Sequence, residues 1–172
     1  ENDFKEKFGI PRQSGKADGV VSRIHFYPPY GVEEAFKGLE GFSHLWLIWG
    51  FSANRHDEWQ PTVRPPRLGG NDRMGVFATR SPFRPNSLAL SCVKIIGIEA
   101  TAENGTVIHV AGADLMDGTP IFDIKPYIPY SDSFPEASGG FTDTAGDFLL
   151  DVNFAPELLK KLPEGKQAAA IG

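Results

Sequence analysis

The chain has 172 residues, 41% of them hydrophobic and 12% aromatic, which is enough for one domain with a substantial core. Its net charge of −5 argues against a generally basic nucleic-acid binder, and no apolar run reaches the ~18–20 residues that a membrane span needs. Cys92 is the only cysteine and the histidines lack metal-ligand spacing, so we expect no disulfide and no metal. The first residues are charged, unlike a signal peptide, so we expect a cytoplasmic protein without a membrane partner.

In chain order, the apolar pattern predicts mostly strands. Stretches rich in Val, Ile and Phe and bounded by Gly, Asn or Asp predict strands at 19–27, 44–51, 74–79, 88–98, 105–115 and 147–154. The stretch 44–51 is apolar throughout, as in a strand buried on both faces or a strand within a barrel. Asn104-Gly105 predicts a tight turn between two of these strands.

Helix signals are few. The stretch 31–40 carries acids early and a lysine late, and 155–162 has a proline near its first turn, so each predicts a short helix. Two stretches with little periodicity, 56–73 and 127–146, predict long loops, which in a compact domain are usually functional. The chain is therefore predicted to be mainly β, a small barrel or sandwich with long loops and one or two short helices.

Several common active-site motifs are absent from the sequence. It has no G-x-G-x-x-G after a strand and no Walker A motif, which argues against the nucleotide-binding α/β folds. It also has no G-x-S-x-G nucleophile motif. Any chemistry must therefore come from another kind of site.

The most informative stretch is RMGVFATRSPFRPNSLALS, residues 73–91, in which a rigid basic loop separates two apolar segments. Pro82 and Pro85 fix the backbone there, so the loop presents Arg80, Arg84 and Asn86 at low entropic cost. Guanidinium groups bind carboxylate and phosphate through paired hydrogen bonds. The basic character extends upstream, since 64–84 holds a single acid and five arginines, Arg64, Arg67, Arg73, Arg80 and Arg84. A directed anionic ligand and a corner whose arginines pair with nearby acids are both consistent with this pattern.

Two further clusters are open to more than one interpretation. The stretch 113–130 groups acids around an Asp-Gly turn, which suits a ligand with ribose hydroxyls but equally suits a solvated turn. In the stretch 9–15, Pro11 fixes a loop that presents Arg12 and Gln13, and this signal is weak alone.

Four stretches together resemble the TrmO family of S-adenosylmethionine-dependent tRNA methyltransferases, also called YaeB-like. They are VRPPRLGGNDRMGVFATRSPFRPN at 63–86, DGTPIFDIKPY at 117–127, KEKFGIPRQ at 5–13 and GLEGFSHLW at 38–46. The resemblance implies a homodimeric β-barrel that uses S-adenosylmethionine to methylate the exocyclic N6 of threonylcarbamoyladenosine, next to the anticodon of threonine tRNA. It implies these cofactor contacts: Pro11, Arg12, Gln13, Ser52, Ala53, Arg80, Leu90, Asp114, Leu115, Met116 and Asp117. At two of them the chain departs from the family, since Ser52-Ala53 stands where relatives often have His-Gln.

The same resemblance suggests how the remaining charged residues act. The threonyl group carries a carboxylate, so we divide the remaining basic and amide side chains between that carboxylate and the RNA backbone: Arg64, Arg67, Arg73, Arg84, Asn86 and Lys125. The target amine is a weak nucleophile, and Asp117, Asp123 and Tyr127 are candidate bases. The chain also departs from its relatives at Ser87-Leu88-Ala89, where Pro-Ile-Gly is common.

The domain prediction and two other functions complete the expectations. Residues 1–155 are predicted to form the barrel, and 156–172 a linker toward a C-terminal lobe that this chain does not include. A non-catalytic RNA-binding barrel would also combine strands with a basic loop. A module that binds a carboxylate metabolite through the arginines is the second alternative.

Overall fold

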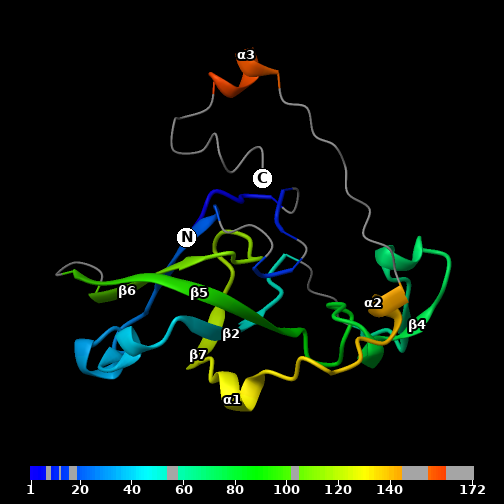
Figure 1. Cartoon of the computed structure of the whole chain (residues 1–172), viewed down its shortest axis with the longest axis horizontal. Coiled ribbons are helices and arrows are strands. Elements are labelled where there is room, and N and C mark those ends of the chain that lie inside the picture. Colours follow the sequence, from blue (N-terminus) through cyan, green and yellow to red (C-terminus); the bar gives the residue numbers. More distant parts are fainter. Residues whose placement is uncertain are drawn as a thin grey trace.

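The chain folds around one strand-rich sheet with a few short helices, as the computed structural model in Figure 1 shows. The structure describes residues 1–6, 9–11, 13–15, 19–53, 58–101, 105–144 and 155–161. The strands are β1 Val21–His25, β2 His44–Gly50, β3 Thr62–Val63, β4 Met74–Gly75, β5 Leu88–Thr101, β6 Gly105–Ala111 and β7 Ile121–Pro126. The α-helices are α1 Pro129–Asp132, α2 Phe141–Thr144 and α3 Pro156–Leu159, and the 3-10 turns are η1 Glu33–Phe36, η2 Leu39–Gly41, η3 Pro66–Leu68 and η4 Val76–Ala78. No described helix is long and apolar enough to cross a membrane.

The main sheet has the strand order β1-β6-β5-β2-β7, and every neighbouring pair is antiparallel. The long strand β5 organises it, because residues 88–94 pair with β2 while 94–101 pair with β6. β1 and β7 are the two edges, and among the described residues they do not pair with each other. β3 and β4 form a separate small ribbon, which in Figure 1 lies beyond one end of the main sheet.

The core lies on one face of this sheet. Leu45, Leu47 and Trp49 alternate along β2 with exposed fractions of 0%, 0% and 7%, so the strand turns one face inward. They pack with buried residues from β5, β6 and the segment after β6: Val93, Ile108, Val110, Ala113 and Leu115. The opposite face of β2 is only partly covered, so of the two alternatives for this apolar run, burial on both faces is wrong.

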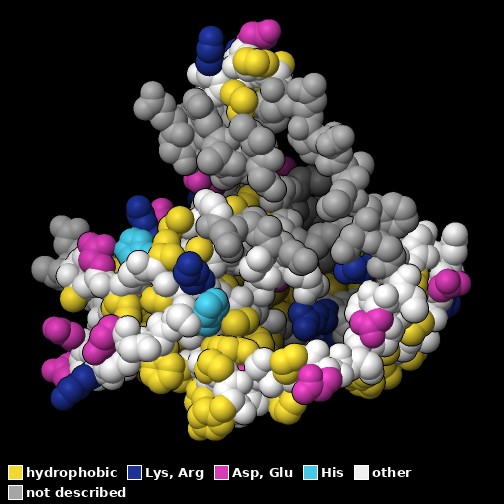
Figure 2. All heavy atoms as spheres, viewed as in Figure 1, with side chains coloured by type: hydrophobic (Ala, Val, Ile, Leu, Met, Phe, Trp, Pro, Cys, Tyr) yellow, Lys and Arg dark blue, Asp and Glu magenta, His cyan; other side chains and the backbone are white. Residues whose placement is uncertain are grey.

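Apolar side chains also remain on the surface near β7 and α1. Figure 2 shows hydrophobic side chains gathered over this part of the molecule. Phe122, Tyr130 and Phe134 are exposed there by 64%, 92% and 73%.

Four of the predicted strands are present: 19–27, 44–51 and 105–115 contain β1, β2 and β6, and 88–98 matches β5, which continues to Thr101. The predicted helix at 155–162 corresponds to α3, whereas the predicted strand at 147–154 and Asn104 of the predicted turn lie outside the described residues. The strand β7 was not predicted, and the long loop expected at 127–146 contains the short helices α1 and α2.

Two element predictions were wrong in type. The helix expected at 31–40 is two 3-10 turns, because Gly38 between them takes a left-handed conformation with φ of 89°. The strand expected at 74–79 pairs only over Met74–Gly75 and then turns into η4, where Thr79 donates its N–H to Val76 O at 3.1 Å. The basic loop that follows this turn lines a cleft together with residues of the ribbon.

Candidate functional site

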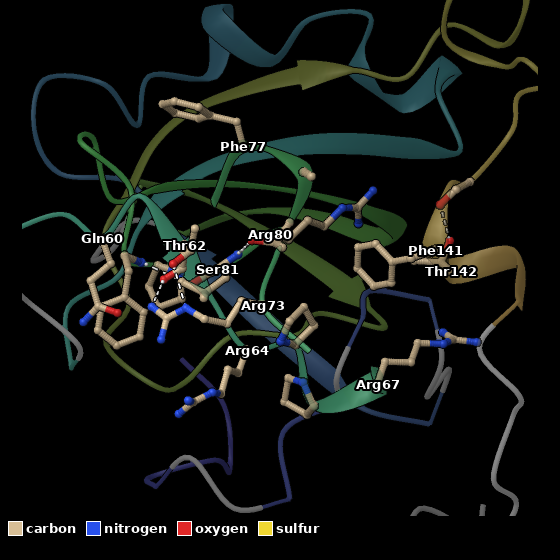
Figure 3. Close-up of a pocket in the computed structure, with 18 of the residues that line it drawn as sticks. Gln60, Thr62, Arg64, Arg67, Arg73, Phe77, Arg80, Ser81, Phe141 and Thr142 are labelled. Carbon is tan, nitrogen blue, oxygen red and sulfur yellow. Dashed lines mark hydrogen bonds between the residues drawn. The ribbon is translucent and has the colours of Figure 1, made fainter. Parts of the chain in front are cut away.

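An arginine-rich cleft of about 1060 Å³ lies beside the β3–β4 ribbon. Its walls come from three separate parts of the chain: Gln13, the segment between Gln60 and Phe83, and the residues around α2. Four of its lining residues are arginines and none of the described lining residues is acidic; the arginines are Arg64, Arg67, Arg73 and Arg80. Figure 3 shows these four side chains around the cleft with Phe141. The composition suits an anionic ligand of substantial size.

The arginines of the cleft differ in how firmly neighbouring residues hold their side chains. Arg73 donates from Nε to Thr62 Oγ1 at 2.9 Å and from a terminal nitrogen to Thr62 O at 3.3 Å, so it ties the two ribbon strands together. Arg80 donates to Gln13 Oε1 at 2.6 Å, which fixes its direction while other guanidinium N–H groups remain for a ligand. Arg64 has no hydrogen-bond or ion-pair partner among the described residues and is exposed. The cleft therefore contains both positioned and available cations.

Arg84 and Asn86, which the sequence analysis singled out with Arg80, do not line the cleft. Arg84 donates to Thr79 O at 2.7 Å and to Val76 O at 3.4 Å, and its guanidinium lies 5.8 Å from the centre of the Phe77 ring. It therefore braces η4 and the loop. Asn86 is exposed, and its backbone oxygen accepts the N–H of Leu88 at 2.7 Å.

Asp114 belongs to a second polar arrangement, next to the core. Trp49 Nε1 donates to Ser91 Oγ at 2.9 Å, and Ser91 Oγ donates to Asp114 Oδ1 at 2.6 Å. Ser91 is 2% exposed, so the chain of bonds links the core to a half-buried carboxylate. Leu90 lies beside Ser91 on β5 and is 53% exposed on the other face of the strand.

Asp117 holds the N-terminal segment against the sheet. Its carboxylate accepts Lys5 Nζ at 2.6 Å and the backbone N–H of Asn2 at 2.9 Å. The hydrogen bond from Lys5, followed by that from Asn2, holds the pKa of Asp117 below its ordinary value. The hydrogen bond to Asp117 raises the pKa of Lys5. A carboxylate held in this way is a weak proton acceptor.

The remaining candidate residues lie outside the cleft. Asp123 and Lys125 are exposed on β7 and form an ion pair with Nζ and Oδ2 at 3.5 Å. Tyr127 packs beside Trp46 with ring centres 5.7 Å apart. Leu115 is 5% exposed, so only its backbone is available, and its oxygen already accepts Asn2 Nδ2.

Five candidate residues remain, and the structure describes four of them. Ser52 and Ala53 are exposed just after β2, Met116 is half-buried, Pro11 is half-buried two residues before Gln13, and Arg12 lies outside the described residues. The cleft thus brings together Gln13 and Arg80 from the predicted cofactor contacts with Arg64, Arg67 and Arg73 from the predicted substrate contacts. Among the residues described, no group of three or more acids, histidines or cysteines could hold a metal ion.

Sequence reasoning did not identify several residues of the cleft. Gln60, Thr62, Phe77, Phe141 and Thr142 line it. The signal for Phe77 was available, because an aromatic residue among arginines is typical of nucleic-acid sites. The contribution of α2 had no local signal, because only the fold brings it near the ribbon.

Comparison with known proteins identifies the family. The model of the tRNA-methyltransferase O N-terminal domain matches residues 1–133. This chain belongs to that family. Of its relatives, the tRNA (adenine(37)-N6)-methyltransferase of Escherichia coli K12 is 44% identical over 159 residues, which are 92% of this chain and 67% of that protein.

A second relative and a solved structure support the assignment. A Pseudomonas aeruginosa protein described as a putative S-adenosylmethionine-dependent methyltransferase is 44% identical over 94% of this chain and 65% of its own length. A crystal structure of TrmO superposes with a TM-score of 0.67 at 38% identity, over 82% of this chain and 59% of that one. The chain therefore spans about two thirds of the length of these curated relatives.

Proposed function

We propose that the chain methylates the exocyclic N6 of threonylcarbamoyladenosine, next to the anticodon of threonine tRNA, with S-adenosylmethionine as the methyl donor. The observation that carries the proposal is the arginine cleft in a chain that is 44% identical to a tRNA (adenine(37)-N6)-methyltransferase. A tRNA loop offers phosphates, and this modified base also offers a carboxylate. A cleft whose described lining holds four guanidinium groups and no acid is suited to both kinds of anion.

The described side chains fit the chemical groups of S-adenosylmethionine. Arg80 would bind its carboxylate, with Gln13 keeping the guanidinium in place. Asp114 Oδ2 accepts no hydrogen bond from the described residues and would take the ribose hydroxyls. Once bound, the cofactor supplies an electrophilic methyl group. The proposed contacts beyond these three are Pro11, Arg12, Ser52, Ala53, Leu90, Met116, Asp117 and the backbone of Leu115.

The chain's main contribution to the reaction is positioning. Methyl transfer requires the amine and the methyl donor to be close and aligned, and holding two reactants in this way lowers the barrier without further chemistry. Arg64, Arg67 and Arg73 would hold the threonyl carboxylate and nearby phosphates. Arg84, Asn86 and Lys125 would contact the RNA further from the reacting base.

The proton of the amine needs an acceptor. Asp117 is held by Lys5 and its pKa lies below the ordinary value, which weakens it as a base. Asp123 and Tyr127 are therefore the better candidates of the three, and the fold places both on or next to β7.

We also propose a homodimer, a closed barrel, a cytoplasmic location and a two-part division of the chain. A homodimer is supported by the exposed apolar side chains of Leu88, Leu90 and Phe122 on β5 and β7, the two strands that flank β2. Closure of the sheet into a barrel, a cytoplasmic location, and a division into a domain at 1–155 and a linker at 156–172 follow from the likeness to the family.

The test compares two forms of the substrate. Threonine tRNA with and without the threonylcarbamoyl group is incubated with the chain and S-adenosylmethionine carrying a labelled methyl group. The proposal predicts transfer to the modified tRNA and much slower transfer to the unmodified one. Equal rates would contradict a carboxylate clamp, and absence of transfer to either would favour a non-catalytic RNA-binding or metabolite-binding protein.

A further inference from the structure

Two exposed aromatic side chains lie ring against ring beside the arginine cleft. Trp59 and Phe77 are 50% and 70% exposed, their ring centres are 6.2 Å apart and their planes are inclined by 23°. Phe77 lines the cleft together with the arginines, and Figure 3 shows its ring at one end of the group. Neither residue has a role in the proposed function so far.

The backbone beneath this pair is well fixed. Gln60 donates its N–H to Phe83 O at 3.0 Å, and Val76 donates to Pro61 O at 3.0 Å. Val76 is 1% exposed and anchors the short turn η4 that carries Phe77. The backbone that carries the two rings is therefore held by hydrogen bonds, which lowers the entropic cost of binding a ligand to them.

Arg84 completes the arrangement. Its guanidinium lies 5.8 Å from the centre of the Phe77 ring and is held there by the carbonyl oxygen of Thr79 at 2.7 Å. A cation placed against an aromatic ring is a recurrent component of sites that bind single-stranded nucleic acid. Arg84 thus holds a positive charge beside the Phe77 ring while it braces the loop that follows η4.

The combination matches an unpaired nucleotide better than other ligands. Stacking on an aromatic side chain needs an accessible base face, which a loop offers and a duplex does not. The phosphates beside such a base would meet the arginines of the same cleft, where none of the described lining residues is acidic. A small carboxylate would use the arginines but would leave the exposed ring pair without a function.

We propose that Trp59 and Phe77 form a stacking platform for an unpaired base of the RNA loop that enters the arginine cleft. This inference rests on the proposed function, since it assumes that the ligand of the cleft is RNA. It adds a substrate-positioning site to the arginines.

The test measures RNA affinity as a function of salt for wild-type chain and variants. The probes are an anticodon stem-loop of threonine tRNA and a fully paired RNA duplex of equal length. Trp59→Ala and Phe77→Ala should each weaken stem-loop binding about ten-fold, leaving duplex affinity and the salt dependence unchanged, because stacking is not electrostatic. Trp59→Phe should keep most of the affinity, and Tyr130→Ala, which removes an aromatic ring 92% exposed outside the cleft, should have no effect.

A variant that removes one positive charge separates the electrostatic contribution to RNA binding from the contribution of base stacking. Arg64→Gln should weaken both probes and reduce the slope of log affinity against log salt by about one unit. Thermal unfolding of each variant verifies that it is folded. Because both rings are exposed, their removal should leave the core intact.

The results distinguish failure of the proposed function from failure of the stacking platform alone. If the wild-type chain binds neither probe, the proposed function and the platform are both overturned. If it binds the stem-loop and both alanine variants bind equally well, or lose loop and duplex affinity alike, only the platform is overturned. A changed oligomeric state with unchanged RNA affinity would assign the pair to a protein contact and also overturn the platform.

Discussion

Replacing Ser91 by alanine tests how the core is connected to the proposed cofactor site. The hydroxyl is 2% exposed, accepts Trp49 Nε1 at 2.9 Å and donates to Asp114 Oδ1 at 2.6 Å. Trp49 is itself 7% exposed, so its indole N–H has no access to bulk water when Ser91 Oγ is removed.

The magnitude follows from these two bonds. A buried donor without an acceptor costs about 1–3 kcal/mol, and a hydrogen bond to a carboxylate contributes about 1.5–3 kcal/mol. Because Asp114 is half-buried and water can replace part of the second bond, we expect Ser91→Ala to lower the free energy of unfolding by about 3 kcal/mol. The freed Asp114 should also bind S-adenosylmethionine more weakly.

Urea unfolding measures the loss of stability. We expect a lower urea midpoint and an unchanged dependence of the unfolding free energy on urea concentration. Asp114→Asn keeps an acceptor oxygen for Ser91 and should cost less, while Ser133→Ala replaces an exposed serine and should be neutral. A change for Ser91→Ala within about 0.5 kcal/mol of wild type, the range of ordinary surface substitutions, would refute the reasoning.

Three further predictions concern the cofactor, the N-terminal segment and the fold. Arg80→Ala should abolish tight S-adenosylmethionine binding by calorimetry, and unchanged affinity would remove its assigned role. Because Lys5 lowers the pKa of Asp117, the pair stabilises the fold above about pH 4 and this contribution is lost as pH falls, so Asp117→Asn should lower the thermal midpoint at neutral pH but not at low pH. Gly105→Ala, with φ of +63° and a Cβ 2.8 Å from Gly31 O, should cost more than about 1 kcal/mol in urea unfolding, whereas Gly75→Ala, with open space at its Cβ, should not.

The strands that form the centre of the sheet could be predicted because their signal is local. β2 and β5 are apolar runs, and burial selects such residues wherever a strand lies in the middle of a sheet. β7 was missed because the sequence IFDIKP places a charge at every second or third position, which is tolerated only at an edge. Its one acid, Asp123, was interpreted as part of a ligand cluster, although it pairs with Lys125 on the same strand.

The basic character of the site could be predicted from the sequence, but most of the other residues that line the cleft could not. The arginines of 64–84 are dense in the sequence, and four of the five line one cleft. Arg84 does not, because it binds the carbonyl oxygens of Val76 and Thr79, and every residue carries such an acceptor. Phe141 reaches the cleft from a distant part of the chain, so only the tertiary structure could reveal it, and Gln13 was expected from the family resemblance and only weakly from its local sequence.

The measurement that tests the central claim most directly is the location of the transferred methyl group. Threonine tRNA carrying threonylcarbamoyladenosine is incubated with the chain and S-adenosylmethionine bearing a deuterated methyl group, then digested to nucleosides for mass spectrometry. The account predicts the label on N6 of the threonylcarbamoyladenosine next to the anticodon, and none when Arg80 is replaced by alanine. Label on another nucleoside, or no label from the wild-type chain, would contradict it.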